Sequence, residues 1–105
     1  MGVLAERGMS APPEVVFSTA TDPDRIDAWL PAPLRVAGAA PASRSDDELK
    51  ARWDGPDGPA ELRVEAADAG GARVRLELPA GSADGLADES LANLEREVAE
   101  NLTAG

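Results

Sequence analysis

The side chains that could do chemistry in this chain are carboxylates, hydroxyls, guanidinium groups, indoles and the amine of Lys50, because its 105 residues include neither histidine nor cysteine. Histidine is the commonest general base and metal ligand near neutral pH. Without cysteine the chain can form no disulfide, thiolate metal site or cysteine nucleophile. A Ser-His-Asp set is therefore excluded, and the sequence contains no P-loop or dinucleotide-binding fingerprint. We expect no cofactor, no metal and no catalytic residue.

Asp27 is the carboxylate that comes nearest to a catalytic position. It lies on a short predicted helix, near the mouth of any pocket inside the domain. Catalysis would require it to face a reacting atom and to have an orienting partner. A solvated surface acid is the simpler interpretation. The sequence therefore favours a non-enzymatic protein.

Charge and length narrow the classes of partner. Twenty acidic residues against ten basic ones give a net charge of −10, which disfavours binding to nucleic acids and to anionic membrane surfaces. No stretch approaches the roughly 20 apolar residues of a membrane helix. The N-terminus also lacks the basic start and apolar run of a signal peptide, so we expect a cytoplasmic protein. Residues 1–105 fit a single domain.

Strands are predicted from alternating apolar and charged residues. The alternation is clear at 49–53, 62–66 and 73–78, with turn-forming residues at 54–59 and 68–71. A weaker strand is expected over 3–9 and a short one at Leu34–Val36, followed by a polar connection over 38–47. Period-two alternation is typical of an antiparallel sheet with one packed face and one solvated face.

Helices are predicted before and after these strands. One begins within Ser10–Glu14, and a second begins at Asp22 and Pro23 and ends at Pro31. A long helix starts near residue 82 or 84 and presents an apolar stripe of Ala87, Leu91, Leu94, Val98 and Leu102. That stripe must be buried, and the apolar sheet face is the surface large enough to cover it. The predicted fold class is α+β.

Three short motifs in the N-terminal part of the sequence resemble those of a known protein superfamily. They are Ala11-Pro12-Pro13-Glu14-Val15-Val16-Phe17, Thr21-Asp22-Pro23 and Trp29-Leu30-Pro31. Together they resemble the N-terminal signature of the START/polyketide-cyclase (SRPBCC) superfamily, nearest to its branch of chaperone-ATPase-activator homologues. The match covers about a fifth of the chain. It implies a helix-grip fold: a small curved antiparallel sheet of about five strands around a long C-terminal helix, with two short helices after the first strand. Family members usually carry more strands, so this chain is a shortened version, and it lacks the glycine pair that commonly follows their second strand.

The resemblance also implies where a ligand would lie. In this superfamily ligands occupy the space between the inner sheet face and the C-terminal helix, which here means Trp53, Leu62, Val64, Val74, Leu76, Leu91 and Leu94. The alternative is that these side chains meet one another and fill a solid core. Trp53 could serve either role, whereas Trp29 belongs to the structural signature.

Two functions from different classes therefore remain open. The first is non-enzymatic binding of a small hydrophobic molecule in a cleft between the sheet and the C-terminal helix. The second is a protein-interaction or co-chaperone-like module with a filled core, no ligand and an unidentified partner. A cyclase- or dehydratase-type enzyme is disfavoured because the predicted interior is apolar. On the outer face, Lys50, Arg52, Arg63, Arg73 and Arg75 alternate with acids, as in cross-strand ion pairs or a docking surface for an acidic partner.

Overall fold

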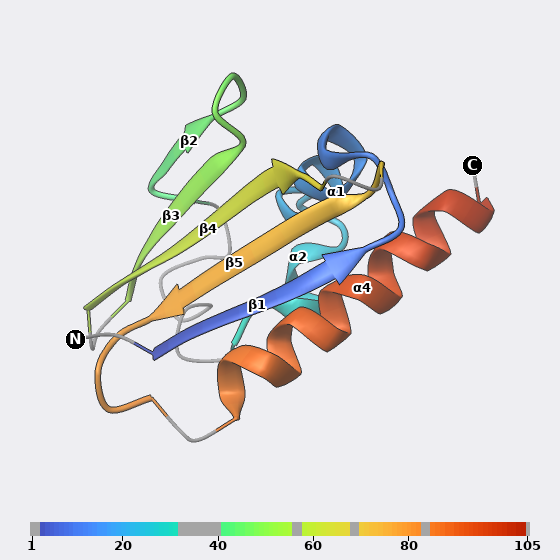
Figure 1. The fold of residues 1–105 in the computed structure, drawn as a ribbon. Coiled ribbons are helices and arrows are strands. Elements are labelled where there is room, and N and C mark those ends of the chain that lie inside the picture. Colours follow the sequence, from blue (N-terminus) through green and yellow to red (C-terminus); the bar gives the residue numbers. More distant parts are fainter. Residues whose placement is uncertain (1–2, 32–40, 56–57, 68–69, 83–84, 105) are drawn as a thin grey trace.

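The computed structural model describes residues 3–31, 41–55, 58–67, 70–82 and 85–104, and it confirms the predicted α+β helix-grip fold (Figure 1). A five-stranded antiparallel sheet combines with short N-terminal helices and a long C-terminal helix. The described elements, in chain order, are β1 (Val3–Met9), α1 (Pro13–Ala20), α2 (Ile26–Trp29), β2 (Ser43–Ser45), β3 (Lys50–Gly55), β4 (Gly58–Ala66), β5 (Ala72–Leu78) and α4 (Leu86–Ala104).

The sheet has the strand order β1-β5-β4-β3-β2, so the first strand lies at one edge and the second at the other. Its register aligns the predicted apolar positions with one another. Leu76 on β5 stands between Ala5 on β1 and Leu62 on β4, and Leu62 in turn faces Ala51 on β3. Directly opposite residues of antiparallel strands point to the same face. These four residues therefore form one apolar row across four strands, and all four are buried.

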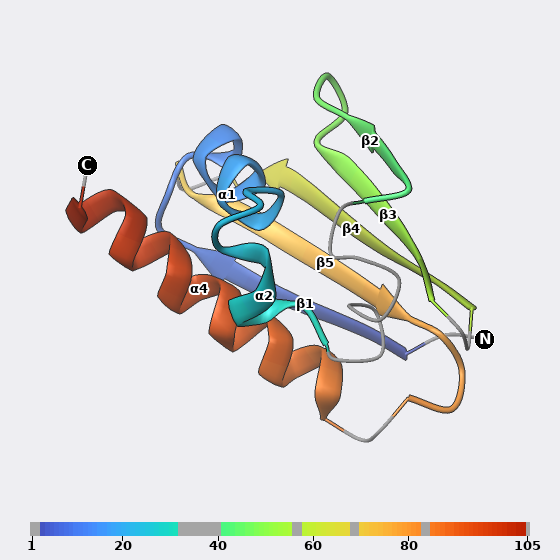
Figure 2. The same ribbon diagram turned by 180° about the vertical axis from the view of Figure 1, so that it is seen from behind.

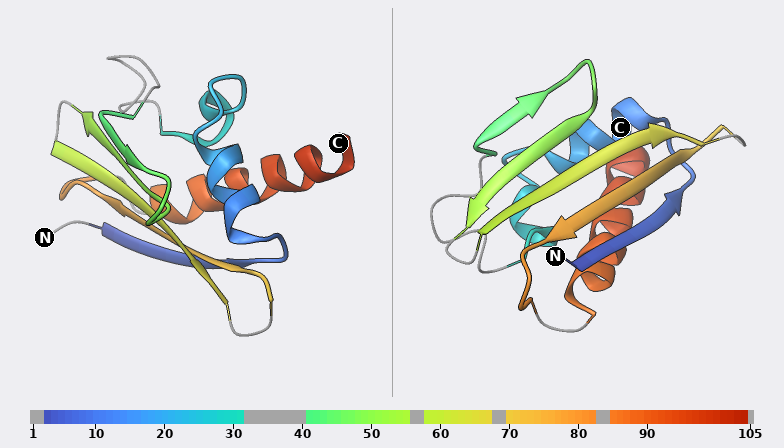
Figure 3. Two further views of the ribbon diagram at one scale, coloured as in Figure 1. Left: turned by 90° about the horizontal axis from the view of Figure 1, so that it is seen from above. Right: turned by 60° about the vertical axis from the view of Figure 1, so that its left-hand side comes forward.

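All three described helices lie on the apolar side of the sheet, which we call the inner face (Figures 2 and 3). The long helix α4 makes its principal contacts with β1, α2, α1 and β5, and α1 also contacts β4 and β5. α4 thus covers mainly the β1 side of the sheet, while α1 extends the cover to β4. The right-hand view of Figure 3 shows that no described helix lies on the opposite side, which we call the outer face.

The second helix is shorter than the sequence predicts. Asp22 makes the bonds predicted for a helix cap, since its carbonyl oxygen accepts hydrogen bonds from the backbone N–H groups of Arg25 and Ile26, but the regular helix begins only at Ile26. Its side-chain Oδ1 accepts a further bond of 2.9 Å from the Asp24 N–H. One helical turn, Ile26–Trp29, then follows. A side-chain bond from an aspartate to the backbone N–H two residues later is an Asx-type turn.

The second half of the sheet also departs from the prediction. The predicted strand at Leu34–Val36 falls outside the described residues, and β2 lies within the segment expected to be a polar connection. Leu49 belongs to the turn before β3 and has a φ of 55°. That left-handed conformation costs a non-glycine residue about 1–2 kcal/mol. The half-buried Leu49 side chain packs against the core, which offsets part of this cost.

The interior is almost wholly aliphatic and aromatic. Within the described chain the buried polar residues are Thr19, Thr21 and Ser90, whose hydroxyls donate to helix carbonyls four residues earlier. No buried side-chain nitrogen or oxygen of the described residues lacks a hydrogen-bond partner. The described part of the core therefore carries no unsatisfied polar side chain that would require a ligand or an ion to complete it.

Candidate ligand-binding face

The seven residues predicted to line a ligand site all lie in the core beneath the helices. Each has at most 2% of its surface exposed: Trp53 on β3, Leu62 and Val64 on β4, Val74 and Leu76 on β5, and Leu91 and Leu94 on α4. They belong to one continuous cluster of buried apolar side chains. The structure thus brings the predicted residues together, and it packs them against one another and their neighbours.

The aromatic side of this cluster is built by α2. The Trp53 ring meets the Trp29 ring edge-to-face, with centroids 5.6 Å apart and planes at 81°. The Trp29 indole is fixed in turn, because its Nε1–H donates a 3.0 Å hydrogen bond to the carbonyl oxygen of Ala20 at the end of α1. The sequence predicts that Trp53 faces the C-terminal helix, whereas its aromatic partner in the structure comes from the short helix α2, between β1 and β2. The inner face therefore has an aromatic end beside α2 and an aliphatic end beneath α4.

Charged side chains reach the inner face at its two edges. The register aligns Arg7 of β1 with the buried Val74 and Arg44 of β2 with the buried Ala51, so both arginines project to the inner side. Arg7 is paired with Glu95 of α4 at 2.8 Å. The Arg44 guanidinium stands 5.4 Å from the ring centroid of Phe17 on α1, and its Nε donates to Asp46 at 2.6 Å. Arg44 is not predicted as a site residue from the sequence, because β2 carries no apolar alternation that would predict a strand.

Polar contacts hold α4 against three other elements. Besides the Arg7–Glu95 pair to β1, Glu97 accepts from Arg25, the residue just before α2, at 3.3 Å. Asn101 donates a 3.0 Å hydrogen bond to the hydroxyl of Thr19 on α1. The side chains of Arg25 and Glu97 are only 23% and 16% exposed, so water screens this pair less than a surface pair. α4 is therefore fixed by these bonds and by the buried part of its apolar stripe, which ends at Val98 because Leu102, predicted to belong to the stripe, is exposed.

The outer face carries the predicted bases together with acids. Register aligns Lys50, Arg63 and Arg75 in one row across three strands, and the neighbouring row contains Arg52, Glu61 and Glu77. Ion pairs join Lys50 to Glu48 at 3.7 Å, Arg52 to Asp54 at 3.2 Å and Arg75 to Glu6 at 3.1 Å. Of these three, only the Arg75–Glu6 pair crosses between strands, as the ion-pair interpretation predicts, whereas the other two join residues two positions apart in the same segment. The mixed charge selects for neither an acidic nor a basic partner.

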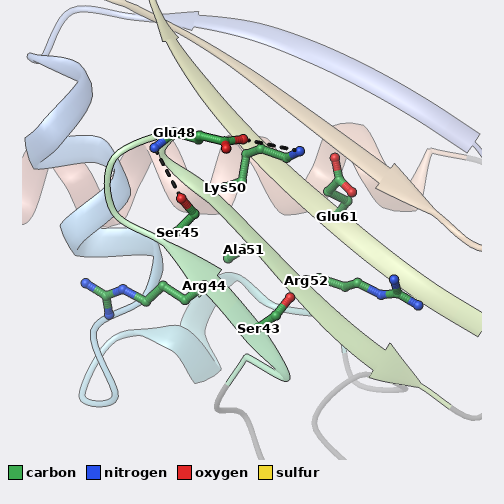
Figure 4. Close-up of a pocket in the computed structure, with 8 residues that line it drawn as sticks. All are labelled: Ser43, Arg44, Ser45, Glu48, Lys50, Ala51, Arg52 and Glu61. Carbon is green, nitrogen blue, oxygen red and sulfur yellow. Dashed lines mark hydrogen bonds and ion pairs between the residues drawn. The ribbon is translucent and has the colours of Figure 1, made fainter.

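Two shallow depressions lie on this outer face. One of about 280 Å³ spans β2 to β4, and Figure 4 shows Lys50, Arg52 and Glu61 around it while the Arg44 side chain extends away from Lys50 and Glu61. The other, of about 200 Å³, is lined by Leu4, Glu61, Arg63, Arg75 and Glu77. Both are lined mainly by charged side chains, unlike the apolar pockets that hold most small ligands.

Asp27 is exposed on α2, as expected of a solvated acid. Among the described residues no group of three or more acidic, histidine or cysteine side chains is arranged to hold a metal ion. No helix in the described ranges combines the length and the apolar character that crossing a membrane requires.

Comparisons with known proteins support the fold. No protein-family model and no curated protein matches the sequence. Among solved structures, protein NE0264 from Nitrosomonas europaea is similar, with a TM-score of 0.63, 13% identity and 96% of each chain covered. Protein SSP2350 from Staphylococcus saprophyticus has a TM-score of 0.65 and 15% identity, with 96% of this chain and 93% of that one covered.

A third structure, Ara h 8.0201, has a TM-score of 0.58 and 12% identity, with 100% of this chain and 99% of that one covered. It is a Bet v 1-like protein with a START/SRPBCC-type fold. At such low identities the likeness concerns the fold alone. This chain therefore has the overall architecture that the resemblance in its sequence implied.

Proposed function

We propose that this protein binds a small hydrophobic molecule, without catalysis, between the inner sheet face and the helices that cover it. The observation that carries this proposal is the apolar row of Ala5, Leu76, Leu62 and Ala51, with Trp53 beside it. In the described part of the chain, charged side chains reach the inner face only at its edges. A charged molecule placed between those edges would lose hydration without gaining a buried partner. An apolar one would gain about 25 cal/mol for each Å² that it hides.

The seven buried core residues are the proposed ligand contacts: Trp53, Leu62, Val64, Val74, Leu76, Leu91 and Leu94. Since each is at most 2% exposed, a ligand must displace packed side chains or move a helix to reach them. Binding is then coupled to a change in packing, and its affinity is reduced by the free energy of that change. The Trp29–Trp53 contact is a natural reporter, because either indole would sense a molecule that enters beside it.

The second candidate is a protein-interaction or co-chaperone-like module without a ligand. Two observations favour it: the seven residues already fill the core, and no described helix covers the outer face. The three sequence motifs, which resemble the chaperone-ATPase-activator homologues, point in the same direction. We place the chain in that branch of the superfamily as part of this proposal.

An NMR screen separates the two candidates. The protein, labelled with ¹⁵N, is mixed with pools of lipid-like, aromatic and polar compounds while the two indole N–H signals are followed. The variant Trp29→Phe assigns them, because the signal that remains belongs to Trp53. We expect an apolar pool to shift the Trp53 signal before it shifts the N–H signals of outer-face residues such as Arg63.

Two results would contradict the ligand-binding proposal. Tight binding of a small polar acid with the Trp53 signal unchanged would exclude the interior as its site. Unchanged spectra across every pool would favour the interaction module instead. Titration of the outer-face variant Arg52→Gln with the same pools is the control, because this residue lies on the opposite side of β3 from Trp53.

A further inference from the structure

We propose that the ligand is an apolar molecule that ends in a carboxylate, and that Arg44 binds this carboxylate. The inference rests on the proposed function and adds the chemical class of the ligand. Its basis is the position of Arg44 at the end of an apolar row, with a guanidinium that is both accessible and oriented.

The position follows from the sheet register. Arg44 on β2 faces Ala51 on β3, which is the last member of the buried row that begins at Ala5. Trp53 is two residues beyond Ala51 on the same strand, which makes it the diagonal neighbour of Arg44. Diagonal neighbours in an antiparallel pair lie about 7–8 Å apart. A molecule beside Trp53 therefore needs only a short apolar body to bring its end group to Arg44.

The guanidinium is available to a second anion. The Arg44 side chain is 45% exposed, and its partner Asp46 is 71% exposed, so this ion pair lies in water and contributes little stability. Asp46 is bonded to Nε, and a guanidinium has five N–H donors, so the terminal nitrogens retain donor capacity. The Phe17 ring beneath the guanidinium restricts its orientation. Arginine presents such donors as a fork that matches a carboxylate.

The other inner-face arginine does not offer this chemistry. Both Nε and a terminal nitrogen of Arg7 contact Glu95 Oε1 at 2.8 Å, and the residue lies on β1, at the sheet edge farthest from β2. Arg44 is thus the inner-face cation beside the aromatic end of the core. A neutral apolar ligand would form no ion pair with its guanidinium group, whereas a carboxylate would.

The test compares decanoic acid with decanol, two probes with the same chain length and different end groups. Dissociation constants are measured by NMR titration for the unaltered protein and for Arg44→Gln and Arg52→Gln. Arg52→Gln is a matched control, because Arg52 also pairs with an acid two residues later, Asp54, but lies on the outer face. Circular dichroism checks that all three proteins are folded.

We expect the unaltered protein to bind the acid about tenfold more tightly than the alcohol, as a charge-assisted hydrogen bond allows. Arg44→Gln should remove that preference and leave the affinity for decanol unchanged, and Arg52→Gln should keep it. Equal affinities for the two probes, or a preference that survives Arg44→Gln, would overturn the role of Arg44 and leave apolar binding intact. If neither probe binds, the inference is also wrong; if the screening pools give no shifts either, the proposed function is wrong with it.

Discussion

Trp29 and Trp53 meet edge-to-face in the core, with ring centroids 5.6 Å apart, and they join the short helix α2 to strand β3. Aromatic pairs of this geometry contribute about 0.5–1.5 kcal/mol beyond the area they bury. The contact fastens the β3 side of the sheet to the N-terminal helices, while α4 covers the β1 side. The helices therefore pack on the sheet at two separate places. We propose that the ligand enters beside the contact between Trp29 and Trp53.

The first prediction concerns the packing of α4. Leu94 is fully buried, so Leu94→Ala should lower the free energy of unfolding by about 2–5 kcal/mol through lost burial and a residual cavity. Leu102→Ala is the control, because Leu102 lies on the same helix and is 51% exposed; it should change stability by less than about 0.5 kcal/mol. Chemical denaturation measures both, and similar losses for the two variants would mean that α4 does not dock through Leu94.

The second prediction concerns the junction between β1 and β5. A Cβ added to Gly71 would overlap the carbonyl oxygen of Met9, whereas one added to Gly8 would meet nothing within 4 Å. Gly71→Ala should therefore destabilise the protein by about 1–3 kcal/mol, because the edge strand must shift. Gly8→Ala should be neutral or slightly stabilising, since alanine restricts the unfolded chain. Thermal unfolding of the two variants checks this, and a Gly71→Ala protein as stable as Gly8→Ala would contradict the register described for β1.

Most of the sheet could be predicted from the sequence because its inner face obeys strict alternation. Leu62, Val64, Val74 and Leu76 are separated by charged residues that need solvent, so a strand with one buried face is the arrangement that satisfies both kinds. The helix stripe of α4 was equally clear at Leu91 and Leu94. Both patterns arise from the burial of one face, and this hydrophobic periodicity is the strongest signal of secondary structure in a sequence.

The parts that could not be predicted depend on contacts made far away in the chain. β2 consists of Ser43, Arg44 and Ser45, and its strand geometry comes from pairing with β3 rather than from its own composition. Leu49 adopts a left-handed turn that its residue type disfavours, because its side chain packs on the core. Arg44 was missed as a candidate binding residue for the same reason: its inward direction follows from the register with Ala51, which no local pattern reveals.

The third prediction concerns nucleic acids. The net charge is −10, and the bases on the described outer face stand among acids, so this face offers phosphates no excess of positive charge. Fluorescence anisotropy with labelled DNA and RNA at physiological salt should show no binding. Micromolar affinity that weakens as salt is added would contradict this expectation. Arg63→Gln would then identify the outer face as the surface responsible if it reduced that affinity.

The most direct test of the proposed ligand site is an isotope-filtered NOE measurement on the protein with the apolar compound that binds most tightly. We predict NOEs from the compound to the Trp53 ring and to methyl groups of Leu62 and Val64, which lie on the inner face. NOEs confined to Leu4, which is 60% exposed on the outer side of β1, would contradict it. The same conclusion would follow if a saturated complex gave no NOE to any of the seven proposed contact residues.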